Sequence, residues 1–184
     1  MKKIFMTLAA AVVAVSASAQ VWVGGELGFS SNHVNGNDDS DKTFTIAPEI
    51  GYDLDENLSV AIKLGYSYAG TRSIIGNDYN NVNAYTINPY ARYTFVKVGN
   101  FSAFVDGGIH YTTLHVQGAE NNFNQMGVAV NPGIAYAVSD KVTLVSHLGD
   151  GLYYNHTWLK DAYRSNNFGL DLFNGISFGA YYNF

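Results

Sequence analysis

The chain has 184 residues, a formal net charge of -5 and no cysteine. The lack of cysteine excludes a disulfide framework, a thiol nucleophile and a lipid-modified N-terminal cysteine. The negative charge argues against nucleic acid as a partner.

The N-terminus has the layout of a secretory signal peptide. Two lysines precede an apolar run from Ile4 to Val15, and Ala17-Ser18-Ala19 supplies small residues for a cleavage site. The alternative, a membrane-spanning helix, needs ~20 apolar residues, and this run is shorter. We therefore predict a cleavable signal peptide over residues 1–19 and a mature domain over residues 20–184. Loss of both lysines lowers the formal charge from -5 to -7.

The rest of the chain alternates apolar and polar residues with a period of two, which is typical of strands. The predicted strands exceed the ~5 or 6 residues usual in soluble proteins and match the ~9 to 11 residues of a tilted strand that crosses a bilayer. In chain order they span Val21–Ser30, Thr43–Leu54, Leu58–Ala69, Asn83–Val96, Phe101–Thr112, Gln125–Val138, Lys141–Tyr154 and Asn167–Phe184.

The connectors between these strands alternate in length. Those after the second, fourth and sixth strands are short (Asp55–Asn57, Lys97–Asn100 and Ser139–Asp140), and the others are long and polar. Short periplasmic turns and long outer loops are typical of outer-membrane barrels, and strands in lipid satisfy their backbone groups only in a closed ring. We therefore predict an all-β fold, an eight-stranded antiparallel up-and-down transmembrane β-barrel, as a monomer.

One segment repeats with a period of roughly forty residues, the length of two strands and two connectors. The copies read IAPEIGYDL from Ile46, INPYARYTF from Ile87 and VNPGIAYAV from Val130, and a fourth from Leu172 has Asn in place of Pro. Each proline lies inside a predicted strand, where its missing N–H removes a ladder bond. Because the prolines occupy equivalent outward positions, we predict a shared β-bulge or local irregularity. The sequence does not identify what satisfies the opposing carbonyl.

The two faces of the predicted strands differ in chemistry. The outward set is apolar, as lipid requires, because Arg or Lys at mid-depth costs ~2 to 4 kcal/mol. Its one charged member, Asp150, lies near a strand end. The inward set is polar, and an eight-stranded barrel is only wide enough for side chains to fill, so its charges need partners. We predict a polar network in the lumen made of Glu26, Glu49, Lys63, Arg92, Asp106, His110, His147 and Asp171.

Within this network we expect Lys63 and Arg92 to act as hubs that pair with Glu26, Glu49 and Asp106. Filled and paired, the network would close the lumen. The functional alternative is a gated pore for small solutes, lined by the same charges.

The chain ends on Ser177-Phe178-Gly179-Ala180-Tyr181-Tyr182-Asn183-Phe184. This resembles the C-terminal assembly signal of outer-membrane barrels, carried here by Ser177, Gly179, Tyr182 and Phe184. With the signal peptide and the hairpin pattern, the chain resembles the small OmpX/OmpA-like outer-membrane β-barrel family, in a form common in the Bacteroidetes.

The resemblance implies several further expectations. The protein would lie in the outer membrane of a Gram-negative cell, be assembled by the barrel assembly machinery and contact lipopolysaccharide. Its role would be envelope integrity and adhesion to host or abiotic surfaces. OmpA itself has a periplasmic peptidoglycan-binding domain that this sequence lacks, so a tether to the cell wall is not expected.

Small outer-membrane barrels also include lipid A modifying enzymes, which is a second alternative. Their deacylases resemble serine hydrolases, with His and Ser two residues apart on one strand face. Here Ser146 and His147 are adjacent and point to opposite faces. His110 has Thr112 two residues on, but no acid that would order it is evident. We predict no enzymatic activity, no catalytic residue, no cofactor and no metal.

The long loops are expected to carry the specificity of the protein. The run Asn35–Asp41 is rich in oxygen ligands for Ca²⁺, but it lacks the terminal Glu of a calcium-hand loop, and we interpret it as a solvated acidic loop. The loops Gly70–Asn81, Leu114–Asn124 and Asn155–Asn166 contain aromatic and Arg residues that suit a contact surface. Alternatively, Trp158 and Tyr163 lie at the outer headgroups.

Overall fold

The computed structural model describes residues 20–33, 40–72, 79–118, 121–160 and 163–184. The predicted signal peptide and most of the run Asn35–Asp41 lie outside these residues. No helix in the described part of the chain is long and apolar enough to span a membrane.

The described residues form strands that close into one antiparallel barrel, in which each strand pairs with its neighbours in the chain and the last pairs with the first. The antiparallel all-β ring is therefore confirmed. The strands in order are β1 (Val21–His33), β2 (Ser40–Asp53), β3 (Leu58–Arg72), β4 (Tyr79–Val98), β5 (Phe101–Val116), β6 (Phe123–Ala137), β7 (Val142–Leu159) and β8 (Tyr163–Asn183).

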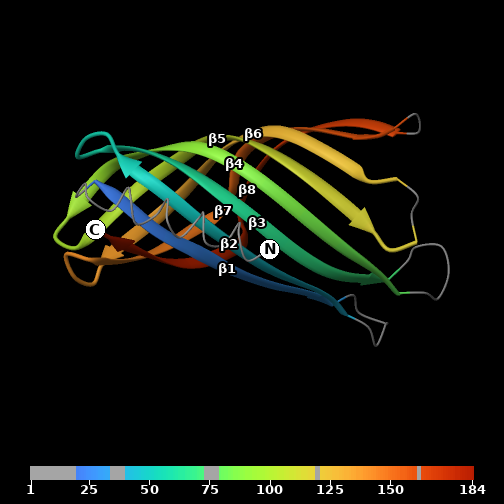
Figure 1. Ribbon diagram of the computed structural model, residues 1–184, viewed down its shortest axis with the longest axis horizontal. Helices are drawn as coiled ribbons and strands as arrows, with labels where there is room; N and C mark the ends of the chain where they lie inside the picture. Colours follow the sequence, from blue (N-terminus) through green and yellow to red (C-terminus); the bar gives the residue numbers. More distant parts are fainter. Residues whose placement is uncertain (1–19, 34–39, 73–78, 119–120, 161–162) are drawn as a thin grey trace, which may run out of the picture.

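The two ends of the barrel differ. Figure 1 shows the turns β2–β3, β4–β5 and β6–β7 at one end, together with the C-terminus, and the C-terminal ends of β1, β3, β5 and β7 at the opposite end. We call these the short-turn end and the loop end. This is the arrangement expected when the short turns face the periplasm.

The strands extend further towards the loop end than the sequence predicted. β4 begins at Tyr79 and β7 ends at Leu159, so much of the predicted loops is strand, and Trp158 and Tyr163 belong to β7 and β8. A repeated hydrogen bond supports the extension, because a tyrosine on one strand donates to an asparagine on the next. The pairs are Tyr66–Asn83 (2.8 Å), Tyr68–Asn81 (2.7 Å), Tyr111–Asn124 (2.9 Å) and Tyr154–Asn166 (3.1 Å).

The prolines interrupt the ladder on one side of their strands. Against the preceding strand each keeps its partner, in the pairs Gly25–Pro48, Ile62–Pro89 and Val105–Pro132. Against the following strand, pairing skips Pro48 and Pro89 with no shift of register. Around Pro132 the register does shift, opposite a β7 segment in which Gly149 and Gly151 have φ values of 107° and 52°. All three prolines therefore lie at a local irregularity of the ladder, as predicted, but only the one at Pro132 shifts the register as a bulge does.

The carbonyl opposite one proline finds a substitute donor. Ile109 lies at the position of β5 that faces Pro89, and the side-chain amide of Asn88 donates to its carbonyl at 2.9 Å. This side-chain bond replaces the ladder bond that proline cannot make, so the register needs no bulge here.

Strand β8 closes the barrel by pairing with β1 over Trp22–Leu27 and Phe178–Asn183. The outward side chains are apolar and exposed, up to 70% for Phe29 and Phe168, whereas inward Glu26 and Arg92 are each 7% exposed. Val21, which the alternation places outside, is buried. An apolar exterior around buried charges is the inverse of a soluble protein and matches a barrel embedded in lipid.

Candidate functional site

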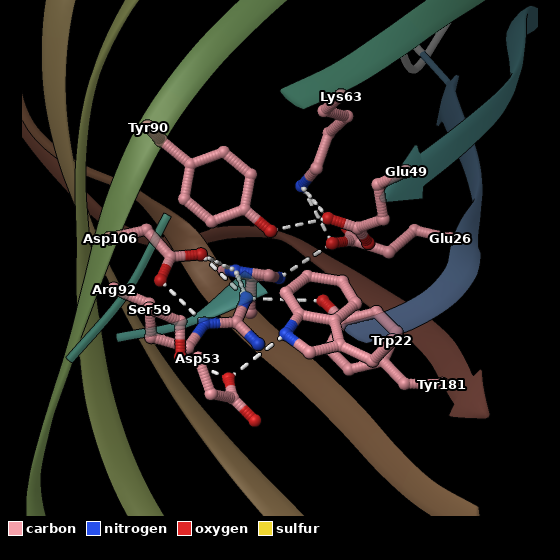
Figure 2. A network of polar contacts seen from close by, with 11 residues as sticks. Trp22, Glu26, Glu49, Asp53, Ser59, Lys63, Tyr90, Arg92, Asp106 and Tyr181 are labelled. Carbon is pink, nitrogen blue, oxygen red and sulfur yellow. Dashed lines mark hydrogen bonds and ion pairs between the residues drawn. The ribbon is translucent and has the colours of Figure 1, made fainter. Parts of the chain in front are cut away.

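The inward side chains of the short-turn half converge on a cluster of charged residues (Figure 2). On one side of it, Lys63 of β3 lies between two carboxylates from β1 and β2. Its Nζ is 2.6 Å from Oε1 of Glu26 and 4.0 Å from Oε2 of Glu49. The hydroxyl of Tyr90 donates to Oε2 of Glu49 at 2.5 Å. The Glu49 side chain is fully buried, and both contacts are made by Oε2, whereas Oε1 has no hydrogen-bond partner among the described residues.

The other side of the cluster is centred on Arg92 of β4. Its Nε and Nη2 donate to the two oxygens of Asp106 on β5, both at 2.7 Å, in the bidentate geometry that favours arginine over lysine. Nη2 also donates to the hydroxyl of Tyr181 at 3.1 Å. All three side chains are buried, so the pair depends on this mutual satisfaction.

His147 of β7 joins the two sides. Its Nε2 is 2.7 Å from Oδ2 of Asp106, and its Nδ1 is 3.0 Å from Oε1 of Glu26. Nε2 shares a hydrogen bond with Asp106, whereas the Nδ1 contact lacks hydrogen-bond geometry. The cluster thus places Lys63, Arg92 and His147 against the carboxylates of Glu26, Glu49 and Asp106.

Aromatic rings enclose the guanidinium of Arg92. Its Cζ lies 3.9 Å from the ring centre of Phe104 and 5.2 Å from that of Tyr181, within the range of cation–π attraction. Trp22 stacks on Tyr181 with ring centres 4.3 Å apart, and its Nε1 donates to Asp53 at 3.2 Å. The rings exclude water from the ion pair and fill the cross-section of the barrel.

Each enclosing ring lies over a glycine directly across the ladder. A Cβ on Gly51 would lie 2.1 Å from the Trp22 ring, and one on Gly133 would lie 2.4 Å from the Phe104 ring. The corresponding ladder pairs are Trp22–Gly51, Phe104–Gly133 and Tyr181–Gly24. Glycine at these positions gives the rings room to lie flat against the wall, which lets them reach the centre of the lumen.

Cavities lie on both sides of this cluster. A cavity of about 480 Å³ lies towards the loop end, and Glu26, Asp106 and His147 form part of its lining. A second cavity of about 420 Å³ lies towards the short-turn end, with Arg92 and Phe104 in its lining. We call the charged cluster and its enclosing rings the plug, defined by Trp22, Glu26, Glu49, Lys63, Tyr90, Arg92, Phe104, Asp106, His147 and Tyr181, because these side chains separate the two spaces.

The structure thus brings together six of the predicted lumen residues and places the other two elsewhere. His110 lines the cavity towards the loop end. Asp171 is half-buried on β8 opposite Gly151. Sequence reasoning missed the rings of Trp22, Phe104 and Tyr181 as members of the site. Their signal was the pairing of large inward aromatics with glycines on neighbouring strands, which becomes visible only once the register is known.

The residues of the predicted assembly signal divide between the two faces of β8. Ser177 donates to Oε2 of Glu26 at 2.6 Å, and Gly179 lies against the same side chain. Tyr182 and Phe184 lie outside, with their rings in edge contact at 5.2 Å. The closing strand therefore contributes both to the plug region and to the lipid-facing surface.

The geometry offers little to hydrolytic chemistry. Ser146 lies opposite Ile134 and Phe178, which are exposed on the outer surface, whereas the neighbouring His147 is buried in the plug. The described residues contain no group of three or more His, Cys, Asp or Glu side chains arranged to hold a metal ion.

Comparisons with known proteins agree with this architecture. A family model described as "Outer membrane protein beta-barrel domain" matches residues 5–184. The fold is similar to that of Neisserial surface protein A, with 18% identity, a TM-score of 0.57, and coverage of 91% of this chain and 98% of that chain. It is also similar to OprG from Pseudomonas aeruginosa, with 12% identity, a TM-score of 0.53 and coverage of 89% and 94%. No curated protein matches.

Proposed function

The chain belongs to the outer membrane protein beta-barrel domain family, and from this premise we propose that it is a non-conducting barrel with a structural and surface-interaction role. Family membership implies location in the outer membrane. In our proposal residues 1–19 direct export and are removed, and the barrel assembly machinery reads β8 through Ser177, Gly179, Tyr182 and Phe184. The mature barrel then works as a monomer among lipopolysaccharide and supports envelope integrity and adhesion through its loops.

The observation that supports a non-conducting barrel is the plug. Arg92 is 7% exposed, Phe104 1% and Tyr181 5%, so water hardly reaches the centre of the lumen. An ion crossing here would have to displace the bidentate Arg92–Asp106 pair and its rings. Breaking a buried pair costs ~3 to 5 kcal/mol, which holds the plug closed at rest.

Planar-bilayer conductance tests this proposal against a small-solute channel. We expect no steady single-channel steps from the wild-type protein. The double variant Arg92→Ala/Phe104→Ala removes the central guanidinium of the plug and the ring 3.9 Å from it, and should produce steps, which proves that the assay detects an open barrel of this size. Steady steps from the wild type that Arg92→Ala alters would favour the channel instead.

Mass spectrometry of lipid A addresses the second alternative, a lipid A modifying enzyme. We expect the same acyl pattern in cells with and without the protein. A loss or gain of an acyl chain that depends on the protein and disappears in a His110→Ala or His147→Ala variant would contradict the proposed role.

A further inference from the structure

A groove on the outer surface of the barrel lies between β5, β6, β7 and β8 near the loop end. It has a volume of about 540 Å³. Its lower part is apolar, and its upper part is aromatic and cationic. The apolar residues are Ile109, Met126, Val128 and Tyr154, each between 45% and 51% exposed, and the upper residues are His156, Trp158 and Arg164.

The side chains in the upper wall of the groove are held in place by specific contacts. A ring of aromatic residues at the membrane interface would not need such contacts. The His156 ring stacks on Trp158 with centres 5.4 Å apart, and Trp158 also lies 6.2 Å from the Tyr111 ring. Oδ1 of Asn166 accepts hydrogen bonds from both His156 Nδ1 (2.7 Å) and the Tyr154 hydroxyl (3.1 Å). These side chains are therefore ordered before any ligand arrives.

Arg164 lies directly opposite Trp158 in the β7–β8 ladder, is exposed, and forms the cationic edge of the groove. Its guanidinium provides the planar set of donors that matches a phosphate. The groove thus presents apolar surface with an exposed guanidinium at its edge, near the loop end of the barrel.

We propose that this groove binds a phosphorylated, acylated glycolipid of the outer leaflet, with one acyl chain against Ile109, Met126 and Val128 and a phosphate on Arg164. The proposal rests on the orientation in the proposed function, in which the loop end faces outwards. It adds a defined lipid site to a surface that would otherwise contact lipid without preference.

The chain's two tryptophans provide a direct assay. Trp158 lies in the groove, whereas Trp22 is 4% exposed inside the lumen, so quenching by bilayer lipid reports on Trp158. The protein is placed in bilayers of phosphatidylcholine with brominated acyl chains, and unbrominated diphosphoryl lipid A is added. Displacement of brominated lipid from the groove restores the fluorescence.

We expect half-recovery for Arg164→Gln to need a roughly tenfold higher mole fraction of lipid A than for the wild type, the size expected for loss of one charge-assisted hydrogen bond. With the wild type, lipid A that lacks its phosphates should also need a roughly tenfold higher mole fraction for half-recovery than intact lipid A does. The matched control is Lys141→Gln, which removes a cation beside the Tyr182 ring at the short-turn end and should leave the wild-type value unchanged.

Equal recovery curves for wild type and Arg164→Gln would overturn the proposal. It would also be overturned if Lys141→Gln raised the mole fraction needed for half-recovery as much as Arg164→Gln does. Phosphatidylglycerol that displaces as well as lipid A would overturn the glycolipid assignment. The same preparations are tested for conductance and for a heat-dependent shift on gels. A closed, folded barrel without lipid preference refutes this site alone, whereas a conducting barrel with the preference refutes the proposed function alone.

Discussion

The two halves of the lumen are built on the same strands with the same polar inward alternation, yet the plug lies in only one of them. In the short-turn half, large rings and paired charges leave Phe104 1% exposed. In the loop half, many inward positions carry small residues, and a cavity of about 480 Å³ remains. Its small lining residues include Gly28, Thr45, Gly65, Ser67, Thr86 and Gly108.

This difference shows that polarity of the inward face does not by itself decide whether a small barrel is closed. The size of the side chains decides it, together with glycines across the ladder that let the large ones reach the centre. Buried charges in the packed half depend on each other, because no solvent replaces a lost partner. In the loop half water can take over a lost hydrogen bond, so the same kind of change should cost less.

The largest effect is expected for Arg92→Ala. The change leaves Asp106 buried without its bidentate partner, and we expect the free energy of unfolding to fall by about 3 to 5 kcal/mol. Urea unfolding in detergent micelles, followed by the heat-dependent gel shift, measures this loss. The control Arg164→Ala makes the same chemical change at an exposed site and should cost under about 0.5 kcal/mol. Equal losses in the two variants would contradict the contrast between packed and solvated arginines.

The sequence predicts which face of a strand a residue lies on, but not which residue lies across from it on the next strand. The period-two alternation identified the strands and placed Glu26, Glu49 and Asp106 inside, because a strand has only two faces. It did not identify Trp22 and Tyr181 as parts of the plug. Their role depends on which residue lies across the ladder, and the turns set that register.

The same limit applies to the prolines and the strand ends. The sequence located the prolines on the outer face but did not reveal that the Asn88 side chain satisfies the Ile109 carbonyl, which needs the β4–β5 register. The strands were predicted too short because asparagine favours loops, whereas Asn81 and Asn166, both in predicted loops, accept hydrogen bonds from tyrosines of neighbouring strands.

The next largest effect sharpens the role of the glycines in the packed half. Gly51→Ala places a Cβ against the Trp22 ring, so the ring must move, and we expect a loss of about 1 to 3 kcal/mol. The three atoms nearest to that Cβ all belong to Trp22, so the penalty should disappear when Gly51→Ala is added to Trp22→Ala. A double-mutant cycle of unfolding free energies measures the coupling. Additive losses would show that the glycine acts through the backbone and not through the ring.

A smaller effect is expected at the wall of the loop half. Asn88→Ala removes the donor to the Ile109 carbonyl and should cost about 1 kcal/mol. The control Asn131→Ala changes the equivalent position of the repeat, where Oδ1 has no hydrogen-bond partner among the described residues, and should cost less. Pro89→Ala restores a backbone N–H opposite Ile109, so adding it to Asn88→Ala should recover stability. If it does not, the ladder gap has another cause.

The smallest effect is expected for loss of a hydroxyl in the loop half. Comparing it with loss of a hydroxyl in the plug contrasts the two halves most directly. Ser67→Ala removes the hydrogen bond between Thr45 and Ser67 (2.8 Å) in the wall of the open cavity and should cost under about 0.5 kcal/mol. Tyr181→Phe removes the hydroxyl that accepts from Arg92 in the plug and should cost about 1.5 to 3 kcal/mol, because the donor is charged and buried. Parallel urea titrations give both values. Similar losses would mean that solvent does not enter the cavity towards the loop end, and the distinction between the half that holds the plug and the loop half would then concern shape alone.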